Sequence, residues 1–356
     1  MKFEAEEIFP RKGLGGSSHA STITEGRDGI LYATWYSGSA EKEADVKIFM
    51  SEKPSGMAWK DPWLIEKEGI TSENPFLDEA ENEEERQALR EEETSEGNPV
   101  LFMDTETGNH RLWLFWETMR GAGDKSGWSM CVLKMKHSED WGRTWTPPRL
   151  LRENIGWGTR NKPIWLSNGE LLLPVSSFGT SFYRFPKEEI AKGSQACKIT
   201  EPDAFITGSY SQPSVIQNKK GELIVYMRTS DSSKGCENLI ATSISTDLGH
   251  TWSHVEPLED KIPNPDSGLD VVTLQNGHVV LLCNPLKQGR QKLTAFLSED
   301  GGHTFPYSKD LEPVEQDKNY HYPAVIQSTD GLIHVTYTNR RLNIKHACFD
   351  EDWIKN

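Results

Sequence analysis

The chain has 356 residues, of which 35% are hydrophobic and 10% aromatic, so it can bury the core of one large domain or two small ones. Its formal net charge of -15 argues against a nucleic-acid partner, because phosphate binding requires clustered Lys and Arg. No run of about 18 apolar residues is present, so we expect no membrane span and no membrane partner.

The chain begins with MKFEAEEIFP, which lacks the basic and apolar regions of a secretory signal. We therefore expect a cytoplasmic protein, although a leader removed from the mature chain would leave secretion open. The five cysteines are scattered and form neither a zinc spacing nor a disulfide framework. Residues 2–10 have strand character at their centre.

Six β-hairpin signals follow along the chain. In each, a short apolar run enters a turn such as Asn-Gly or Asp-Gly, and a second run rich in β-branched and aromatic residues leaves it. Each hairpin is followed by sequence for two more strands, which predicts six four-stranded units. The hairpins span residues 19–37, 98–118, 161–177, 212–229, 269–285 and 322–339.

An eight-residue phrase recurs among these hairpins, as SEDWGRTW (138–145), STDLGHTW (245–252) and SEDGGHTF (298–305). The first residues of the copies, Ser138, Ser245 and Ser298, stand 107 and then 53 residues apart, close to two units and one. A fixed period of this length indicates a β-propeller. A two-sheet sandwich would not require the period. Asp side chains bind nearby backbone amides and Gly permits positive φ, so the phrase is interpreted as a turn and not as a catalytic acid site.

The predicted fold is therefore all-β: one six-bladed propeller domain of four-stranded antiparallel blades over residues 1–356. The simplest closure has the N-terminal strand completing the sixth blade. The strongly acidic segment 73–96 lies between the first and second blades. Its thin apolar stripe favours a short, exposed helical insertion in a loop.

The repeated phrase resembles the Asp-box of the sialidase superfamily, the bacterial neuraminidase repeat. The resemblance runs over nearly the whole chain and is closest to the sialidase-like branch, most of which lacks a proven substrate. It supports the propeller fold strongly. It indicates activity only weakly, because enzymes of several specificities and non-enzymes carry the phrase.

The blade register predicts which side chains surround the propeller axis at one mouth. The starts of first strands and the ends of second strands meet there, and their residues are mostly polar and aromatic, which suits a sugar. These residues are His19, Asn98, Lys162, Gln212, Asp270 and Tyr322 at strand starts, and Trp35, Tyr36, Glu117, Ser177, Arg228, Asn284, Arg340 and Arg341 at strand ends.

The sialidase resemblance implies roles for four residues. Sialidases hold the substrate carboxylate with three arginines, and they use an acid/base Asp and a Tyr nucleophile that a Glu activates. Tyr322 matches the nucleophile, since a phenol needs an activating neighbour. Asp45 matches the acid/base group. Arg228 and Arg290 match two of the arginines, whose fork suits a carboxylate.

Two positions depart from the sialidase pattern. His19 stands where the first arginine is expected, and Gln212 stands where the activating Glu is expected; Gln cannot accept the phenolic proton. His19 titrates near neutral pH and could itself act as acid or base. Other candidate bases are Glu41, Glu43 and Glu117.

Each assignment has a structural alternative. Tyr322 would then be an inner-strand aromatic, Arg228 and Arg290 would pair with loop acids, His19 would be a hydrogen-bonding group on the axis, and Asp45 would cap a loop. The ten histidines show no metal-binding spacing, and no glycine-rich phosphate loop is present, so we expect no cofactor and no catalytic metal. A structural Ca²⁺ on the axis stays open.

The expected function is that of a sialidase-like carbohydrate-active enzyme, an exo-acting glycoside hydrolase on a terminal anionic sugar. Sialic acid, a related ulosonic acid and a uronic acid are the candidates, so the expected partner is a small anionic carbohydrate or glycan terminus. Two alternatives stay open. One is a lyase or hydrolase of rhamnose-glucuronate type that uses His19, and the other is a non-catalytic glycan-binding propeller. The oligomeric state is not predicted.

Overall fold

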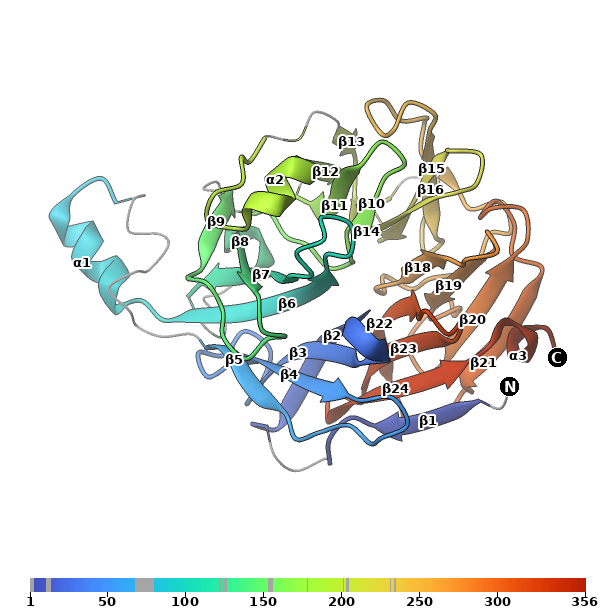
Figure 1. The fold of residues 1–356 in the computed structure, drawn as a ribbon, viewed down its shortest axis with the longest axis horizontal. Helices are drawn as coiled ribbons and strands as arrows, with labels where there is room; N and C mark the ends of the chain where they lie inside the picture. The colour runs from blue at the N-terminus through green and yellow to red at the C-terminus, as the bar shows by residue number, and fades with distance from the viewer. Residues whose placement is uncertain are drawn as a thin grey trace.

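The structure is a computed structural model that describes residues 3–10, 14–67, 80–121, 123, 127–152, 156–177, 179–200, 202, 205–230, 232–233 and 235–356. Within these residues the strands form six separate four-stranded antiparallel sheets. The sheets are arranged around a central axis as the blades of a propeller (Figure 1). The predicted six-bladed propeller is confirmed.

Each blade is built outward from the axis by consecutive hairpins. Blades one to three comprise β2 (Ser17–Glu25), β3 (Leu31–Gly38), β4 (Lys47–Lys53) and β5 (Trp63–Lys67); β6 (Thr94–Met103), β7 (Leu112–Arg120), β8 (Cys131–Ser138) and β9 (Arg149–Arg152); and β10 (Ile164–Trp165), β11 (Glu170–Ser176), β12 (Gly179–Pro186) and β13 (Phe205–Thr207).

Blades four to six follow the same plan. They comprise β14 (Tyr210–Gln217), β15 (Leu223–Thr229), β16 (Ala241–Ser245) and β17 (Glu256–Pro257); β18 (Asp270–Thr273), β19 (Val279–Cys283), β20 (Leu293–Ser298) and β21 (Tyr307–Glu312); and β22 (Tyr320–Gln327), β23 (Ile333–Asn339), β24 (Asn343–Phe349) and β1 (Glu4–Glu7).

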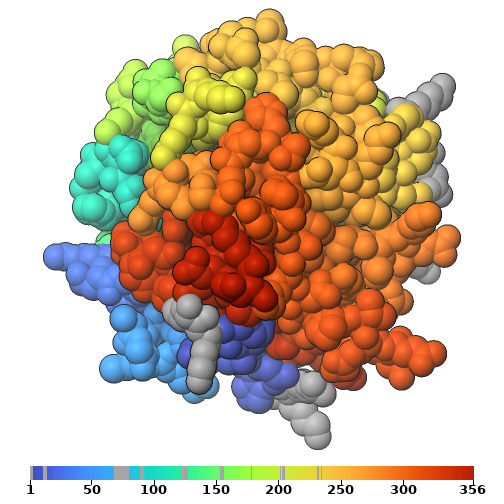
Figure 2. Space-filling view, turned by 90° about the vertical axis from the view of Figure 1, so that its right-hand side faces the viewer, coloured from blue at the N-terminus to red at the C-terminus, as the bar shows by residue number. Residues whose placement is uncertain are grey.

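The sixth blade joins the two ends of the chain. β1 pairs antiparallel with β24, with Glu4 opposite Cys348 and Glu7 opposite Lys345. N-terminal residues consequently lie beside the C-terminal segment on one side of the molecule (Figure 2). This pairing satisfies the outer edge of β24, which would otherwise present unpaired backbone groups.

The helices are short. α1 (Glu83–Glu91) projects from the body of the propeller between the first two blades (Figure 1). α2 (Lys187–Lys192) packs against blade three and α3 (Glu351–Lys355) against blade five. Part of the expected acidic insertion, residues 73–79, lies outside the described residues, and its last three residues belong to β6. No helix in the described ranges is long and apolar enough to cross a membrane.

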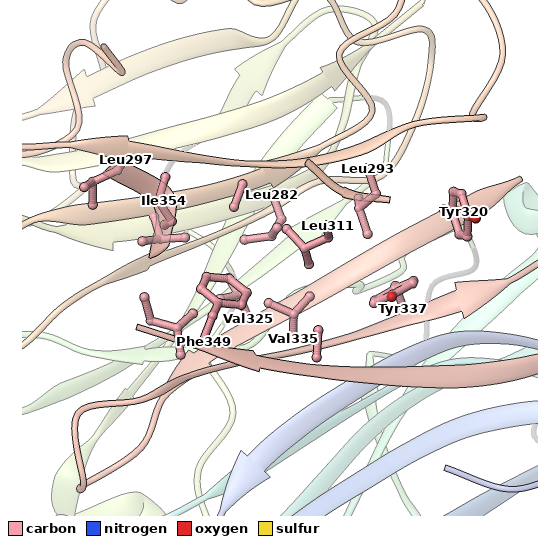
Figure 3. Packing of buried hydrophobic residues seen from close by; sticks show 14 of the residues in the cluster. Leu282, Leu293, Leu297, Leu311, Tyr320, Val325, Val335, Tyr337, Phe349 and Ile354 are labelled. Carbon is pink, nitrogen blue, oxygen red and sulfur yellow. The ribbon is translucent and has the colours of Figure 1, made fainter. Parts of the chain in front are cut away.

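Apolar side chains fill the space between neighbouring blades. Leu282 and Leu297 of blade five meet Val335 and Phe349 of blade six, and Ile354 of α3 closes the end of this cluster (Figure 3). Alternate residues of a strand face opposite sides of its sheet, so every blade supplies apolar side chains to two neighbours. The packed blades form a rigid frame around the axis.

The repeated phrase forms the same turn in each copy. Ser245 Oγ donates to Asp247 Oδ1 at 2.7 Å and accepts from the backbone N–H of Gly249 at 2.8 Å. Hydrogen bonds from Thr251 and Ser245 hold the pKa of Asp247 below its usual range. The phrase therefore joins the third and fourth strands of a blade, away from the axis.

Candidate active site

Four inner strands carry the same irregularity at the axis. β2, β6, β14 and β22 each contain a register shift in their pairing with the next strand. At each shift one residue has positive φ: Ala20 (54°), Asn98 (38°), Gln212 (49°) and Tyr322 (50°). Such bulges re-aim side chains, and strained backbone of this kind concentrates at functional sites.

A cavity of about 440 Å³ opens at this end of the axis. Polar and charged side chains dominate its wall. It is lined by Glu41, Asn98, Glu117, Trp128, Ser129, Cys131, Gly156, Gly158, Thr159, Ser176, Ser177, Ser211, Gln212, Arg228, Arg290, Tyr322 and Arg341. Of the ten predicted site residues, Asn98, Gln212, Arg228, Arg290 and Tyr322 are brought together here.

The phenolic oxygen of Tyr322 lies between two donors. Arg228 Nη1 donates to it at 2.8 Å, and Gln212 Nε2 donates to it at 3.0 Å. Gln212 Oε1 in turn accepts from Arg228 Nη1 at 2.9 Å, which orients the amide. The phenol thus has a guanidinium and an amide beside it where the sialidase pattern has a carboxylate.

Arg228 and Arg290 converge on Tyr322 and on Asp266. Arg228 Nε contacts Asp266 Oδ1 at 2.6 Å, and Arg290 Nη2 donates to the backbone carbonyl of Asp266 at 2.7 Å. The Arg290 guanidinium carbon lies 5.8 Å from the centre of the Tyr322 ring. Against the cost of burial, Tyr322 and Asp266 raise the pKa of Arg228 above its usual range.

His321 holds Arg290 from the other side. Arg290 Nη1 donates to His321 Nδ1 at 3.0 Å, so this nitrogen is the unprotonated one. Burial, Arg290 and Arg341 together lower the pKa of His321 to about 3. His321 is therefore a neutral acceptor that orients the arginine.

Arg341 is the third arginine on the cavity wall. Its Nη1 pairs with Glu41 Oε2 at 2.6 Å. Against the cost of burial, Glu41 and Tyr36 raise the pKa of Arg341 above its usual range. Burial first, and then the charges of Arg228 and Arg341, hold the pKa of Arg290 below its usual range.

Glu117 supplies a carboxyl group of unusual protonation. Thr159 N–H donates to Oε1 at 2.7 Å and Asn98 Nδ2 donates to Oε2 at 2.9 Å. Burial nevertheless raises the pKa of Glu117 to about 8. A side chain at Gly158 would collide with Glu117 Oε1, so the glycine permits the close approach. At neutral pH the cavity therefore holds a protonated carboxylic acid.

Comparison with known proteins places the chain in a family. The BNR repeat-like domain matches residues 29–335. The chain belongs to the BNR repeat-like family. No curated protein matches.

Solved sialidase structures share the fold at low sequence identity. A Hadza microbial sialidase matches with a TM-score of 0.74 at 17% identity, over 98% of this chain and 69% of that chain. The intramolecular trans-sialidase from Ruminococcus gnavus, in complex with oseltamivir carboxylate, matches with a TM-score of 0.74 at 15% identity, over 98% of both chains. The leech intramolecular trans-sialidase, complexed with 2,7-anhydro-Neu5Ac, matches with a TM-score of 0.74 at 14% identity, over 99% of this chain and 71% of that chain. This BNR repeat-like protein thus has the sialidase fold.

Asp45 does not line the cavity of this BNR repeat-like protein. It is exposed, and its two carboxylate oxygens each accept from the backbone N–H of Ser39 at 3.0 Å. The role that the contacts show is that of a loop cap between β3 and β4. Glu41, four residues earlier, is the acid that this loop places on the wall.

His19 lies behind Tyr322 and not on the cavity wall. The ring centres of the two residues are 4.5 Å apart, and only 2% of His19 is exposed. Burial, followed by Arg341 and His321, lowers the pKa of His19 well below its usual range. The expected titration near neutral pH is therefore corrected, because a charged imidazole is disfavoured among buried arginines. In β2, His19 is the last paired residue before the register shift, as His321 is in β22. Ala20 therefore occupies in β2 the position that Tyr322 occupies in β22.

Three other predicted residues lie elsewhere. Lys162 precedes β10, which begins at Ile164, and its Nζ pairs with Asp270 Oδ2 at 2.8 Å. Trp35 is buried and stacks on Phe9 at 4.9 Å on the opposite face of its strand from Tyr36. Arg340 is absent from the described lining, and its neighbour Arg341 takes the place on the wall.

Arg160 was missed by sequence reasoning and lies beneath the site. Its guanidinium carbon is 4.9 Å from the Tyr322 ring centre, and Nη2 donates to the Tyr322 carbonyl at 2.7 Å. Only 2% of Arg160 is exposed to solvent. It precedes the first strand of blade three, a place that hairpin signals do not mark.

One group of residues has metal-ligand chemistry outside the cavity. His278, Glu299 and Glu351 place ligand atoms within 4.8 Å of one another. Lys355 Nζ already pairs with Glu299 at 2.6 Å and Glu351 at 2.8 Å. One ammonium group thus already pairs with both carboxylates between blades five and six.

Proposed function

We propose that this protein is an exo-acting glycoside hydrolase for a terminal sugar that bears a carboxylate. The observation that carries the proposal is the convergence of Arg228, Arg290 and Arg341 with Tyr322 in one cavity. The chain as a whole has a net charge of -15, whereas this one cavity gathers three positively charged arginines. A cavity of this kind favours a small anionic ligand.

The arginines are assigned to the substrate carboxylate. Asp266, His321 and Glu41 each hold one of the three guanidinium groups, which reduces the rotational freedom lost on binding. Arginine presents parallel N–H donors that match a carboxylate in two-point contacts. Solved neighbours with inhibitors or sugars bound, such as the complex with oseltamivir carboxylate, support an anionic ligand.

Tyr322 is assigned as the nucleophile. Negative charge on its oxygen would be stabilised by the donors from Arg228 and Gln212. Gln212 has no basic site, so the phenolic proton needs another acceptor. Glu41, a carboxylate on the same wall, takes this role in the proposal.

Glu117 is assigned as the acid that protonates the leaving oxygen. Each carboxyl oxygen already accepts one hydrogen bond, from Thr159 or Asn98, and the group lines the cavity. Because burial raises its pKa to about 8, the group carries its proton at neutral pH. As the bond from the anomeric carbon to the leaving oxygen breaks and Tyr322 bonds to that carbon, the proton from Glu117 goes to the leaving oxygen, and the aglycone departs as an alcohol.

A fluorogenic screen tests the proposal. The 4-methylumbelliferyl glycosides of sialic acid, a ketodeoxyoctonic acid and glucuronic acid would be incubated with the wild type, Tyr322→Phe and Val314→Ala. Val314 is an exposed apolar residue that is not part of the described lining, and it serves as the control. We expect release from one glycoside by the wild type and the control, and its loss in Tyr322→Phe.

A glycan-binding protein without catalysis is the second candidate. Gln212 replaces the activating carboxylate, and Asp45 caps a loop, so two parts of the sialidase machinery are missing from the cavity. This candidate predicts that a sugar acid raises the melting temperature while no glycoside is cleaved. Chemistry based on His19 is less well supported, because that side chain is buried behind Tyr322.

A further inference from the structure

Two further hollows lie at blades three and four, and the first of them adjoins the central cavity. The first, of about 380 Å³, is lined by Ser177, Gly208, Ser209, Tyr210, Ser211 and Ser230. Ser177 and Ser211 also line the central cavity, so the two spaces share a wall.

The second hollow begins at Tyr210. It measures about 450 Å³ and is lined by Phe205, Ile206, Thr207, Tyr210, His250, Thr251, Trp252, Ser253, His254 and Val255. Tyr210 lines both hollows, so the two hollows adjoin at this residue, beside blades three and four. β13 and β14, which carry Phe205 and Tyr210, are consecutive strands at this junction (Figure 1). We call the two adjoining hollows the blade 3–4 trough.

The chemistry of the trough differs from that of the cavity. Among its described lining residues there is no Asp, Glu, Lys or Arg, although 26% of the whole chain is charged. Serine hydroxyls line the inner part and aromatic rings line the outer part. Phe205 is 45% exposed, one of the few large apolar side chains left open to solvent in the described residues. Hydroxyls with open aromatic faces suit uncharged sugars.

The local backbone is built to hold these rings in place. Gly208 has φ of 127°, and a side chain there would lie 2.6 Å from the ring of Tyr210. A side chain at Gly179 would lie 2.9 Å from the ring of Phe205. Trp252 stacks on Phe182 with ring centres 4.8 Å apart, which fixes one face of the outer wall. Substitution of either glycine would displace a ring.

We propose that the blade 3–4 trough binds the neutral sugar units that precede the terminal sugar acid. The substrate would then be an oligosaccharide with an anionic end, and not a glycoside with a small leaving group. This inference rests on the proposed function for its anionic end. The trough's contact with neutral sugars can be measured separately.

Chain length is the first test. Values of kcat/KM would be compared for a disaccharide and a pentasaccharide with a neutral backbone, both of which end in the sugar acid released in the fluorogenic screen, with the same terminal linkage. In the wild type the longer substrate should have a kcat/KM about five-fold higher, the gain expected from about one aromatic stacking contact. In Phe205→Ala most of this difference in kcat/KM between the two substrates should be lost. Leu64→Ala, an apolar residue of similar exposure (44%) on the outer strand of blade one, should keep it.

Binding of the neutral part alone is the second test. Saturation-transfer NMR would be recorded on the neutral tetrasaccharide that remains when the pentasaccharide loses its terminal sugar acid. The proteins would be the wild type, Phe205→Ala and Leu64→Ala. We expect transfer to the sugar from the wild type and from Leu64→Ala, and a several-fold weaker signal with Phe205→Ala.

The outcomes separate the two proposals. Turnover with equal kcat/KM for both chain lengths, unaffected by Phe205→Ala, would overturn the trough and leave the hydrolase intact. Absence of turnover together with tetrasaccharide binding that depends on Phe205 would overturn the hydrolase and support the trough. Absence of both would overturn both.

Discussion

The raised pKa of Glu117 predicts how the free energy of unfolding varies with pH. The carboxyl titrates near pH 4.5 in the unfolded chain, and burial raises its pKa to about 8 in the folded protein. Between these values the folded state binds the proton more tightly, so its contribution to the free energy of unfolding is complete below about pH 4.5 and is lost as the pH rises through 8. The loss is up to about 1.4 kcal/mol per pH unit, or roughly 2.5 kcal/mol between pH 5.5 and 7.5.

Urea unfolding at several pH values measures this effect. Glu117→Gln removes the titration, and Asn98 can turn its amide to accept from the new amide group. The free energy of unfolding of the wild type should therefore fall relative to that of Glu117→Gln as the pH rises from 5.5 to 7.5. Glu259→Gln, at an exposed site, should follow the wild type. Parallel curves for the wild type and Glu117→Gln would refute the argument that burial keeps this acid protonated.

Three further substitutions test other parts of the molecule. Arg228→Met should weaken sugar-acid binding by about 10- to 100-fold in calorimetric titration, since a charge-assisted hydrogen bond contributes about 1.5–3 kcal/mol; an unchanged Kd would remove Arg228 from the site. Gly158→Ala should displace Glu117 and lower kcat far more than it raises KM. Steady-state kinetics measures both constants, and an unchanged kcat would contradict the assignment of Glu117. Ser245→Ala should lower the free energy of unfolding by about 1–3 kcal/mol, because the buried hydroxyl bonds both Asp247 and a backbone amide, yet sugar binding by the folded protein should persist.

The propeller was predictable because its signals are local and repeated. Turn residues mark each hairpin, and the phrase beginning at Ser138, Ser245 and Ser298 measures the blade length. These features depend on backbone conformation within a few residues. β6 begins at Thr94, earlier than the hairpin pattern that starts at Asn98 predicts, because the first residues of this strand belong to an acidic segment without an apolar pattern.

Two patterns predict the part of the candidate site that reaches the cavity wall: the sialidase resemblance identifies Arg228 and Arg290, and the shared start of the inner hairpins identifies three further residues. Tyr322, Gln212 and Asn98 occupy equivalent bulges, and all three line the cavity. His19 was assigned to the same register but stands one residue earlier, which turns its ring beneath Tyr322.

Long-range contacts account for the remaining differences. Arg341 was distinguishable from Arg340 only through its contact with Glu41, 300 residues away in the chain. Arg160 reaches the site through the carbonyl of Tyr322, which no local pattern encodes. Spacing along the chain identifies the strand end but not the direction in which a side chain at a tight turn points.

A crystal structure with a bound sugar acid is the most direct test of the central claim. The arginine assignment predicts a carboxylate within about 3.2 Å of guanidinium nitrogens from at least two of Arg228, Arg290 and Arg341, with the sugar ring over Tyr322. A sugar acid bound in the cavity with its carboxylate facing away from all three arginines would contradict the account.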